Sequence, residues 1–453
     1  MMISEFLSIA IALLALPYVV RDGAAPLLFG LFLFGALYFS YAVIPLITGE
    51  NRYQLDALHS SGSGNVAKLT ALIFLAISLG RMGKRYYRYV VSDRNVSLLF
   101  MLVILTTLIP GILTIMTGDF LQKQNLLAVV AMYGLIWFGY VGLRNDKESG
   151  LRVALGVSQL AVLISIQVFA LLVACYEVFS LRAWATFLNN SGEIVYRASS
   201  IQFNPNVYGM WCAILVLGFS YAFHQKCLAR WIALLGIVTA SGGLFFSGSR
   251  SAGLLLGMAL AAVAILIREG EVWRRWVPFF SVFVVFTAIS AISIYFIEYP
   301  GWNAVALLGE RFIAYPLQLF NYFGVAVPHF YVGLPKDVVL SIEGRFSVGV
   351  MRDSGILTLY DDAGWPGLVA MVGLWLTMGI WGIKTYLVRL DVPSVYALMA
   401  FSFCVFISVV MRFQVFPVWV FVATILTYCV YYWRSANVQE KQFGHRSVSR
   451  SSM

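Results

Sequence analysis

The residues best suited to chemistry lie in one long polar segment, residues 298–363, which separates two strongly apolar parts of the chain. This segment carries Arg311, Arg345 and Arg352, and Asp353 directly follows the last of these. A guanidinium binds phosphate through a planar, two-pronged fork and stays charged at every working pH. A nearby positive charge also keeps a carboxylate ionised. These residue types together predict a site that binds a phosphate-bearing substrate beside a general base.

A second candidate region begins at Arg197 and leads to the sequence Asn204-Pro205-Asn206. Asn followed by Pro is typical of a helix start, with Pro near the first helical position. The free backbone N–H groups and the dipole of such an N-terminus attract anions. The simpler interpretation is an ordinary helix cap with Arg197 in solvent, and the sequence leaves both interpretations open.

A third candidate region is the short turn from Ser247 to Ser251, which contains Gly248 and Arg250 and joins two almost purely apolar segments. Glycine permits the sharp reversal of the chain, and the serines leave room around the guanidinium. An unpaired arginine at this depth costs on the order of a few kcal/mol. Arg250 therefore needs a counter-charge, which is either a substrate anion or a lipid phosphate reached by the extended side chain.

The elements that position these residues are membrane helices. Hydrophobic residues make up 60% of the chain and charged residues only 11%, which excludes an ordinary globular domain. Apolar runs of about twenty residues recur along the chain and lack the alternation of barrel strands. The sequence predicts an all-α, polytopic membrane protein of about thirteen transmembrane helices. The expected spans are 3–20, 24–48, 67–80, 96–117, 125–143, 153–177, 206–223, 231–247, 252–267, 277–297, 364–383, 394–411 and 417–433.

The distribution of Lys and Arg predicts the orientation of these helices. Basic residues concentrate in alternate connections and in the C-terminal tail, which we expect to be cytoplasmic: 81–95, 144–152, 224–230, 268–275, 384–393 and the residues after Arg434. The N-terminus and the long polar segment then face outward. The net charge of +10 follows from membrane topology on this interpretation, which argues against a nucleic-acid partner.

The same pattern divides the chain into four parts: helices with short loops over 1–297, a large periplasmic catalytic loop over 298–363, C-terminal helices over 364–434, and a disordered basic cytoplasmic tail over 435–453. The sequence contains no paired metal-ligand spacing and no P-loop, so we expect no metal and no cofactor. The energy for a reaction must then come from an activated substrate or from a gradient. The cysteines are interpreted as small apolar packing residues.

The ordered motifs between about residues 197 and 385 resemble the O-antigen ligase and polymerase superfamily of bacterial membrane glycosyltransferases. The shared features are an Arg before an Asn-Pro-Asn helix start, a Ser-x-Ser-Arg turn ending at Arg250, and a large outward loop. That loop ends in a polar pair, here Asp353-Ser354, followed by Leu357, Gly364, Gly367 and Leu368. Ligases typically have His-Asn at the polar pair, whereas an Asp here is similar to the polymerase branch.

The resemblance implies transfer of a glycan from a polyprenyl (undecaprenyl) diphosphate donor to the sugar end of a second lipid-linked unit. The reaction is metal-independent, inverts the anomeric carbon and takes place on the periplasmic face of the bacterial inner membrane. Within this expectation Arg250, Arg311 and Arg345 hold the diphosphate, with Arg250 and Arg345 catalytic beside Asp353 as the base. The substrate-binding residues are expected to be Arg197, Asn204, Asn206, Arg311, Arg352 and Ser354.

Three alternatives remain open at this point. Asp353 is also explained by an ion pair with Arg352 or another arginine that only holds the loop. The chain is also explained as a ligase that transfers a finished glycan to lipid A–core. A secondary transporter or lipid flippase is a third class, although such proteins usually show paired internal repeats, which are not evident here. The sequence does not say whether a chain-length regulator protein binds.

Overall fold

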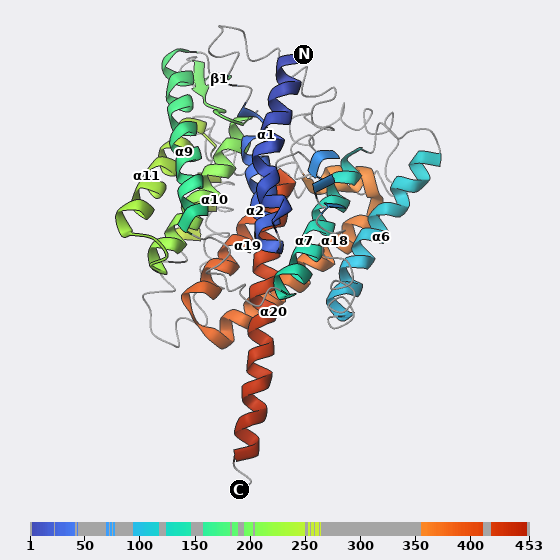
Figure 1. Ribbon diagram of the computed structural model, residues 1–453. Coiled ribbons are helices and arrows are strands. Elements are labelled where there is room, and N and C mark those ends of the chain that lie inside the picture. Colours follow the sequence, from blue (N-terminus) through green and yellow to red (C-terminus); the bar gives the residue numbers. More distant parts are fainter. Residues whose placement is uncertain are drawn as a thin grey trace, which may run out of the picture.

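The computed structural model of the chain is a bundle of helices with the two termini at opposite ends (Figure 1). It describes residues 2–21, 23–40, 43, 69–71, 73–74, 76–77, 94–116, 124–145, 157–181, 184–188, 194–202, 204–249, 252–253, 255–257, 259–261, 263, 355–410 and 418–450. The helices are α1 (Met2–Val20), α2 (Ala24–Leu37), α6 (Arg94–Met116), α7 (Gln124–Asn145), α9 (Val157–Phe179), α10 (Pro205–His224), α11 (Arg230–Ser247), α18 (Gly355–Arg389), α19 (Val392–Val410) and α20 (Val418–Arg450).

These helices have the character of membrane spans, as the sequence predicted. Within the described residues, four are long and apolar enough to cross a membrane: Ser158–Phe179, Pro205–His224, Arg230–Ser247 and Pro366–Arg389. Shorter apolar helices accompany them, α2 among them. Large apolar side chains such as Phe245 (80% exposed) and Val238 (66% exposed) point away from the bundle. Such a surface is costly in water and favourable in hydrocarbon.

Aromatic rings join the helices at the centre of the bundle. Phe32 of α2, Trp211 of α10 and Phe421 of α20 form a triangle in which each pair of ring centroids is 5.0–5.4 Å apart. All three side chains are buried. Tilted contacts at these distances are favourable beyond the burial of apolar area alone. The triangle fixes the relative heights of three helices that are far apart in the sequence.

Side-chain contacts also show which helix ends lie together. The ring of His224, at the end of α10, lies 5.9 Å from Tyr396 near the start of α19. The guanidinium of Arg389, at the end of α18, lies 5.5 Å from the ring centroid of Tyr432 on α20. That of Arg434 lies over Trp381 of α18. The end of the bundle where these contacts lie is called the basic end. The described basic residues of the bundle at this end are Arg21, Arg94, Arg144, Lys226, Arg230, Lys384, Arg389 and Arg434.

A small antiparallel hairpin precedes α10 and was not expected from the sequence. Strand β1 (Trp184–Leu188) pairs with β2 (Ile194–Arg197), and the register places Trp184 opposite Arg197. The strands are rich in aromatic and β-branched residues, and the intervening sequence Asn-Asn-Ser-Gly-Glu contains residue types that favour turns. The hairpin lies at the end of the bundle that carries the N-terminus (Figure 1).

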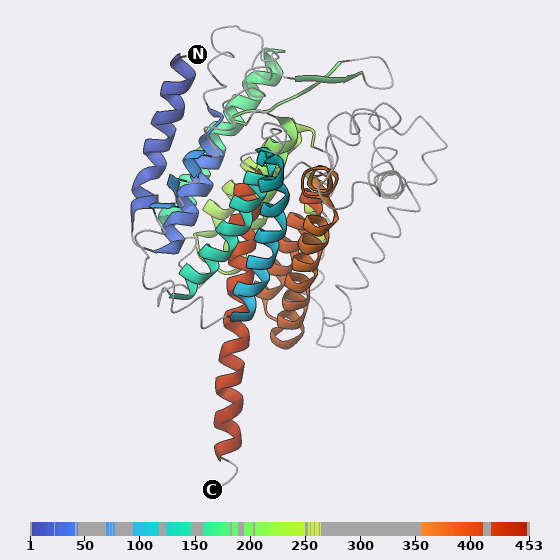
Figure 2. The same cartoon turned by 90° about the vertical axis from the view of Figure 1, so that its right-hand side faces the viewer.

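Helix α18 begins before the boundary predicted at residue 364. It starts at Gly355, and both Gly355 and Leu359 are buried, which is the one-turn spacing of a helix face packed on its neighbours. Pro366 lies inside this helix. The first turns run across the bundle before the helix turns along it (Figures 1 and 2), a bend of the kind that an internal proline produces.

The C-terminal segment also differs from the prediction. A disordered tail was expected over 435–453, but α20 continues as a helix to Arg450. Its last part extends away from the bundle (Figure 2). The segment contains Gln, Glu, Lys and Arg, which are good helix formers, and it prolongs a helix that is already nucleated. Extension of an existing helix therefore needs no packing partner for each turn.

Candidate functional site

The segment between β2 and α10 is a buried loop within a helical protein. Ser199, Ser200 and Gln202 have no measurable exposure, and Arg197 is 8% exposed. Irregular backbone in such surroundings is stable only when its polar groups find partners inside the protein. The partners come from the neighbouring helices, so the loop is fixed by the bundle around it.

Three helices hold this loop. The amide of Ala198 donates to the carbonyl of Phe246 on α11 at 2.9 Å. The amide of Ser200 donates to Oε2 of Glu177 on α9 at 2.7 Å, and Ser200 adopts a positive φ of 51°. Nε2 of Gln202 donates to the carbonyl of Ala36 on α2 at 2.8 Å.

Arg197 contacts two of the sequence motifs: the Asn-Pro-Asn motif that starts α10 and the serine turn that ends α11. Its Nε donates to the carbonyl oxygen of Ser247 at 2.8 Å, and one terminal nitrogen donates to Oδ1 of Asn206 at 2.7 Å. The first bond satisfies a carbonyl at the C-terminal end of α11, where a cation also interacts favourably with the helix dipole. The second reaches the first turn of α10. One guanidinium therefore holds both helix ends together.

The start of α10 has the capping geometry expected from Asn-Pro-Asn. Asn204 is extended, and its Oδ1 accepts a hydrogen bond from the amide of Asn206 at 2.8 Å. Pro205 occupies the beginning of the helix. The predicted helix start is confirmed. The simpler interpretation placed Arg197 in solvent, and this is wrong because the guanidinium is buried against Asn206 and Ser247.

The Ser247-Gly248-Ser249 turn follows α11 directly. Gly248 has a φ of 56° and caps the helix in the left-handed conformation, which glycine adopts without steric cost. A Cβ at this position would lie 3.2 Å from Nε of Arg197. Oγ of Ser247 accepts from the amide of Ser249 at 3.2 Å and donates to the carbonyl of Leu244 at 2.7 Å. The turn is thereby fixed up to the residue before Arg250.

Small residues allow the two helices to approach each other at this turn. A Cβ added to Gly209 of α10 would collide with the side chain of Ser249 and would lie 2.8 Å from Oγ of Ser247. Interfaces between membrane helices typically use such small residues, because close backbone approach increases packing. The approach brings the Asn-Pro-Asn start and the serine turn to the same end of the bundle.

This site lies at the end of the bundle opposite the basic end. Arg197 meets the first turn of α10 and the last residue of α11. Lys226, which follows α10, and Arg230, the first residue of α11, lie at the other ends of the same two helices. The sequence predicted this separation, since it placed Arg197 outside and the connection 224–230 in the cytoplasm. In the structure Arg197 and the 224–230 connection do lie at opposite ends of α10 and α11.

The predicted site residues thus fall into two groups. Arg197, Asn204 and Asn206 are described and lie together. The other predicted residues lie outside the described part of the chain: Arg250, Arg311, Arg345, Arg352, Asp353 and Ser354. The clamp of guanidiniums with a neighbouring base therefore stays a prediction.

Two buried polar side chains on α9 were missed by sequence reasoning. Glu177 on α9 has no measurable exposure and accepts the amide of Ser200. Gln167, also on α9, accepts from Nε1 of Trp211 at 2.9 Å and donates to the carbonyl of Thr239 at 3.1 Å. The available signal was a carboxylate and an amide within an apolar span, since ionisable groups in spans are functional candidates by default.

The hydrogen bonds of Arg197 position the start of α10 and the serine turn relative to each other. A buried cation is held by a carbonyl and a side-chain amide oxygen, the capped N-terminus of α10 lies at the same end, and the chain passes from the fixed turn directly to Arg250. This combination favours binding of an anion at this end. Searches of family models and of curated proteins give no match to this chain.

Proposed function

We propose that the chain is a polysaccharide polymerase of a bacterial inner membrane. The donor is a glycan on polyprenyl diphosphate, and the acceptor is the sugar end of a second lipid-linked repeat unit at the periplasmic face. This proposal rests on the resemblance of the ordered motifs to O-antigen and exopolysaccharide polymerases. The membrane character of the helices agrees with lipid-linked substrates.

The observation that supports the proposal most directly is the bridge made by Arg197. The Asn-Pro-Asn helix start and the serine turn were selected separately in the sequence, and Arg197 bonds to Asn206 of one and to Ser247 of the other. Motifs that serve one site must lie close together. Helix α18 begins at Gly355, two positions after Asp353. Its other end, at Arg389, lies at the basic end.

In the proposed reaction the acceptor hydroxyl oxygen attacks the anomeric carbon of the donor. The bond from that carbon to the diphosphate oxygen breaks with inversion, and Asp353 accepts the hydroxyl proton. Arg250, Arg311 and Arg345 stabilise the charge that develops on the leaving diphosphate, which is why neither nucleotide nor metal is needed. Arg352 keeps Asp353 ionised. Arg197 positions the turn that carries Arg250.

The test is the surface polysaccharide of a strain that produces Asp353→Asn in place of the wild-type chain. General-base help contributes about 10²–10⁴-fold to rate, so we expect the ladder of long chains on a gel to disappear. Core bearing one repeat unit should remain, because ligation does not depend on a polymerase. Arg250→Gln should have the same effect, whereas the matched control Arg230→Gln, exposed at the basic end, should retain the ladder.

Two outcomes would overturn the proposal in different ways. A persisting ladder in Asp353→Asn and Arg250→Gln would show that these residues do not carry the reaction. Loss of even the single-unit product would instead indicate a ligase. Uptake of a solute by vesicles containing the chain, driven by a proton or sodium gradient, would point to a transporter.

A further inference from the structure

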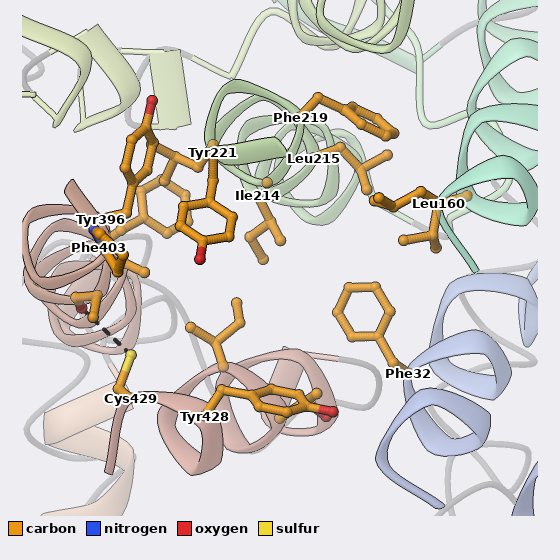
Figure 3. A pocket seen from close by; sticks show the side chains of 18 of the residues that line it. Phe32, Leu160, Ile214, Leu215, Phe219, Tyr221, Tyr396, Phe403, Tyr428 and Cys429 are labelled. Carbon is orange, nitrogen blue, oxygen red and sulfur yellow. Dashed lines mark hydrogen bonds between the residues drawn. The ribbon is translucent and has the colours of Figure 1, made fainter. Parts of the chain in front are cut away.

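The interior of the bundle contains an apolar cavity that the proposed reaction does not use. It has a volume of about 200 Å³, several times the share of one water molecule. Five helices line it: α2, α9, α10, α19 and α20. Figure 3 shows Phe32, Leu160, Leu215 and Tyr428 around the open centre. An apolar cavity of this kind takes hydrocarbon rather than water.

The cavity lies at the same depth on every helix that lines it. Its lining residues on α10 are Ile214 to Tyr221, which at 1.5 Å per residue is roughly 5–15 Å from His224, the end of the helix at the basic end. On α20 the lining residues Thr424 to Cys429 are roughly 8–15 Å from Arg434. The cavity thus occupies the half of the bundle next to the basic end.

The other three helices agree with this placement: on α19 the lining residues Pro393 to Phe403 follow the start of the helix by roughly 2–17 Å. Leu160 and Leu163 follow the start of α9 by roughly 5–9 Å, and Phe29 and Phe32 follow the start of α2 by roughly 8–12 Å. This depth is about half of a ~30 Å hydrocarbon core, which is the depth that one acyl chain fills. A hydrocarbon chain entering from the basic end reaches the whole cavity without crossing the midplane.

The charged residues next to the cavity determine which lipid head group is favoured there. Lys226, in the connection between α10 and α11, and Arg230, the first residue of α11, are exposed, and Arg389 and Arg434 lie at the same end on α18 and α20. Asp391 is the acidic group described there, and it already accepts from the hydroxyl of Tyr432 at 2.9 Å and from the amide of Ser394. The excess of positive charge attracts anionic head groups.

A few polar side chains line the otherwise apolar cavity, Tyr221, Thr424 and Tyr428 among them. The hydroxyl of Tyr221 points toward its centre (Figure 3), and the ring is held 5.4 Å from that of Tyr396. Tyr221 is also near the end of α10, at the level where the ester groups of a phospholipid would lie below its phosphate.

We propose that this cavity binds an acyl chain of an anionic phospholipid from the leaflet at the basic end, with the phosphate held by Lys226 and Arg230. Gly218 makes room for the chain, because a Cβ at this position would meet no atom within 4 Å. Ala397 and Ala400 of α19 line the same space. The site is separate from the Arg197 loop, which lies at the opposite end of α10, and it does not depend on the proposed reaction.

The test uses the full chain reconstituted in vesicles of phosphatidylcholine and phosphatidylglycerol in equal amounts. Lipids that remain bound after extraction are identified by native mass spectrometry. We expect phosphatidylglycerol to be retained in preference to phosphatidylcholine. The Lys226→Gln and Arg230→Gln changes should each reduce this preference by about fivefold, the fold-change that corresponds to about 1 kcal/mol per basic residue near a membrane surface. Arg94→Gln is the matched control, because Arg94 lies at the same end on α6, which does not line the cavity.

A second pair of variants tests the cavity independently of the charges. Gly218→Leu places a side chain where an added Cβ meets no atom within 4 Å, and it should abolish selective retention of phosphatidylglycerol. Gly373→Leu of α18 makes the same change at a glycine that also has open space and does not line the cavity, and it should leave retention unchanged. Unchanged thermal unfolding of both variants shows that they fold.

Three results would overturn this proposal. Equal retention of the two phospholipids would show that bulk lipid fills the cavity without selection. Retention by Gly218→Leu at the wild-type level would place the bound lipid elsewhere. Displacement of the retained lipid by polyprenyl phosphate, with phosphatidylglycerol unable to compete, would assign the cavity to the tail of a lipid-linked glycan.

Discussion

Arg197 is a buried cation whose hydrogen bonds organise two helix ends. Removing a guanidinium from water carries a large desolvation cost, which hydrogen bonds to oxygens offset only when their geometry is good. The bonds to Ser247 and Asn206 are 2.8 and 2.7 Å long, within the range of strong, charge-assisted hydrogen bonds. The planar fork matters here because two oxygens on different helices are reached by one side chain.

At this scale we predict that Arg197→Met destabilises the protein. Hydrogen bonds to charged groups contribute about 1.5–3 kcal/mol, and the change leaves the carbonyl oxygen of Ser247 and Oδ1 of Asn206 without this donor. The free energy of unfolding should fall by about 2–4 kcal/mol, measured by equilibrium unfolding in mixed micelles. Arg197→Lys should recover only part of the loss, because an ammonium is a single point of charge.

The matched control for this prediction is Arg94→Met. Arg94 is the first residue of α6 and is exposed, so its replacement should change unfolding little. An equal loss in the two variants would mean that the bridge between α10 and α11 is not what the guanidinium of Arg197 contributes.

Among the helices, Gln167 links α9 to α10 and α11. It lies on α9, accepts from Trp211 of α10 and donates to the backbone of α11 at Thr239. All three of these residues are buried. Hydrogen bonds between membrane helices contribute about 0.6 kcal/mol on average, with the larger values reaching about 1.7 kcal/mol. The link therefore has a modest but measurable effect on how α9 packs.

We predict that Gln167→Leu lowers the free energy of unfolding by about 1–2 kcal/mol, because it leaves the indole N–H of Trp211 without its acceptor inside the bundle. The fluorescence of Trp211 should also change, since its hydrogen bond is lost. The control is Leu172→Ala on the same helix, at a side chain that is 64% exposed. A larger loss in the control than in Gln167→Leu would contradict the assigned role of the amide.

The boundaries of four helices could be predicted because they depend on local sequence. The expected spans 96–117, 125–143, 206–223 and 231–247 differ by only a few residues from α6, α7, α10 and α11. Long apolar runs between polar residues determine these limits, and Asn204 caps α10 as its residue type indicates. The hairpin was missed because its strands are short and lie beside a much stronger apolar signal.

The contacts within the candidate site could not be predicted, because they depend on tertiary packing. Arg197 and Ser247 are separated by 50 positions in the sequence, and no periodicity encodes their approach. Glu177 and Gln167 were overlooked for the same reason, since only the packed bundle shows which loop or helix each one meets. The sequence could identify polar residues at the helix ends, whereas their partners follow from the way α9, α10 and α11 pack.

At the scale of the whole molecule, the two ends of the bundle have different chemistry. One end gathers basic residues such as Lys226, Arg389 and Arg434, and the other holds the buried loop at Arg197. Basic residues favour the cytoplasmic side of a membrane. The proposed reaction requires the Arg197 end to face the periplasm, so orientation is the property on which it depends most.

We predict that a cysteine introduced at Lys226 reacts with a membrane-impermeant maleimide only after the inner membrane is opened. A cysteine at Leu181, which is 64% exposed beside the hairpin, should react in intact spheroplasts. Both are introduced into a chain whose five native cysteines have been replaced, since two of these are partly exposed. The opposite labelling pattern would place Arg197 on the cytoplasmic side and remove the basis for a periplasmic glycosyl transfer.

The length of α20 has a consequence for how the protein can be tagged. The helix runs from Val418 to Arg450, and the part after Arg434 adds roughly 24 Å at 1.5 Å per residue. A fluorescent protein joined after this rigid rod would stand clear of the lipid head groups, with no flexible linker needed. A fusion at residue 435 would instead place the same fluorescent protein next to the membrane surface.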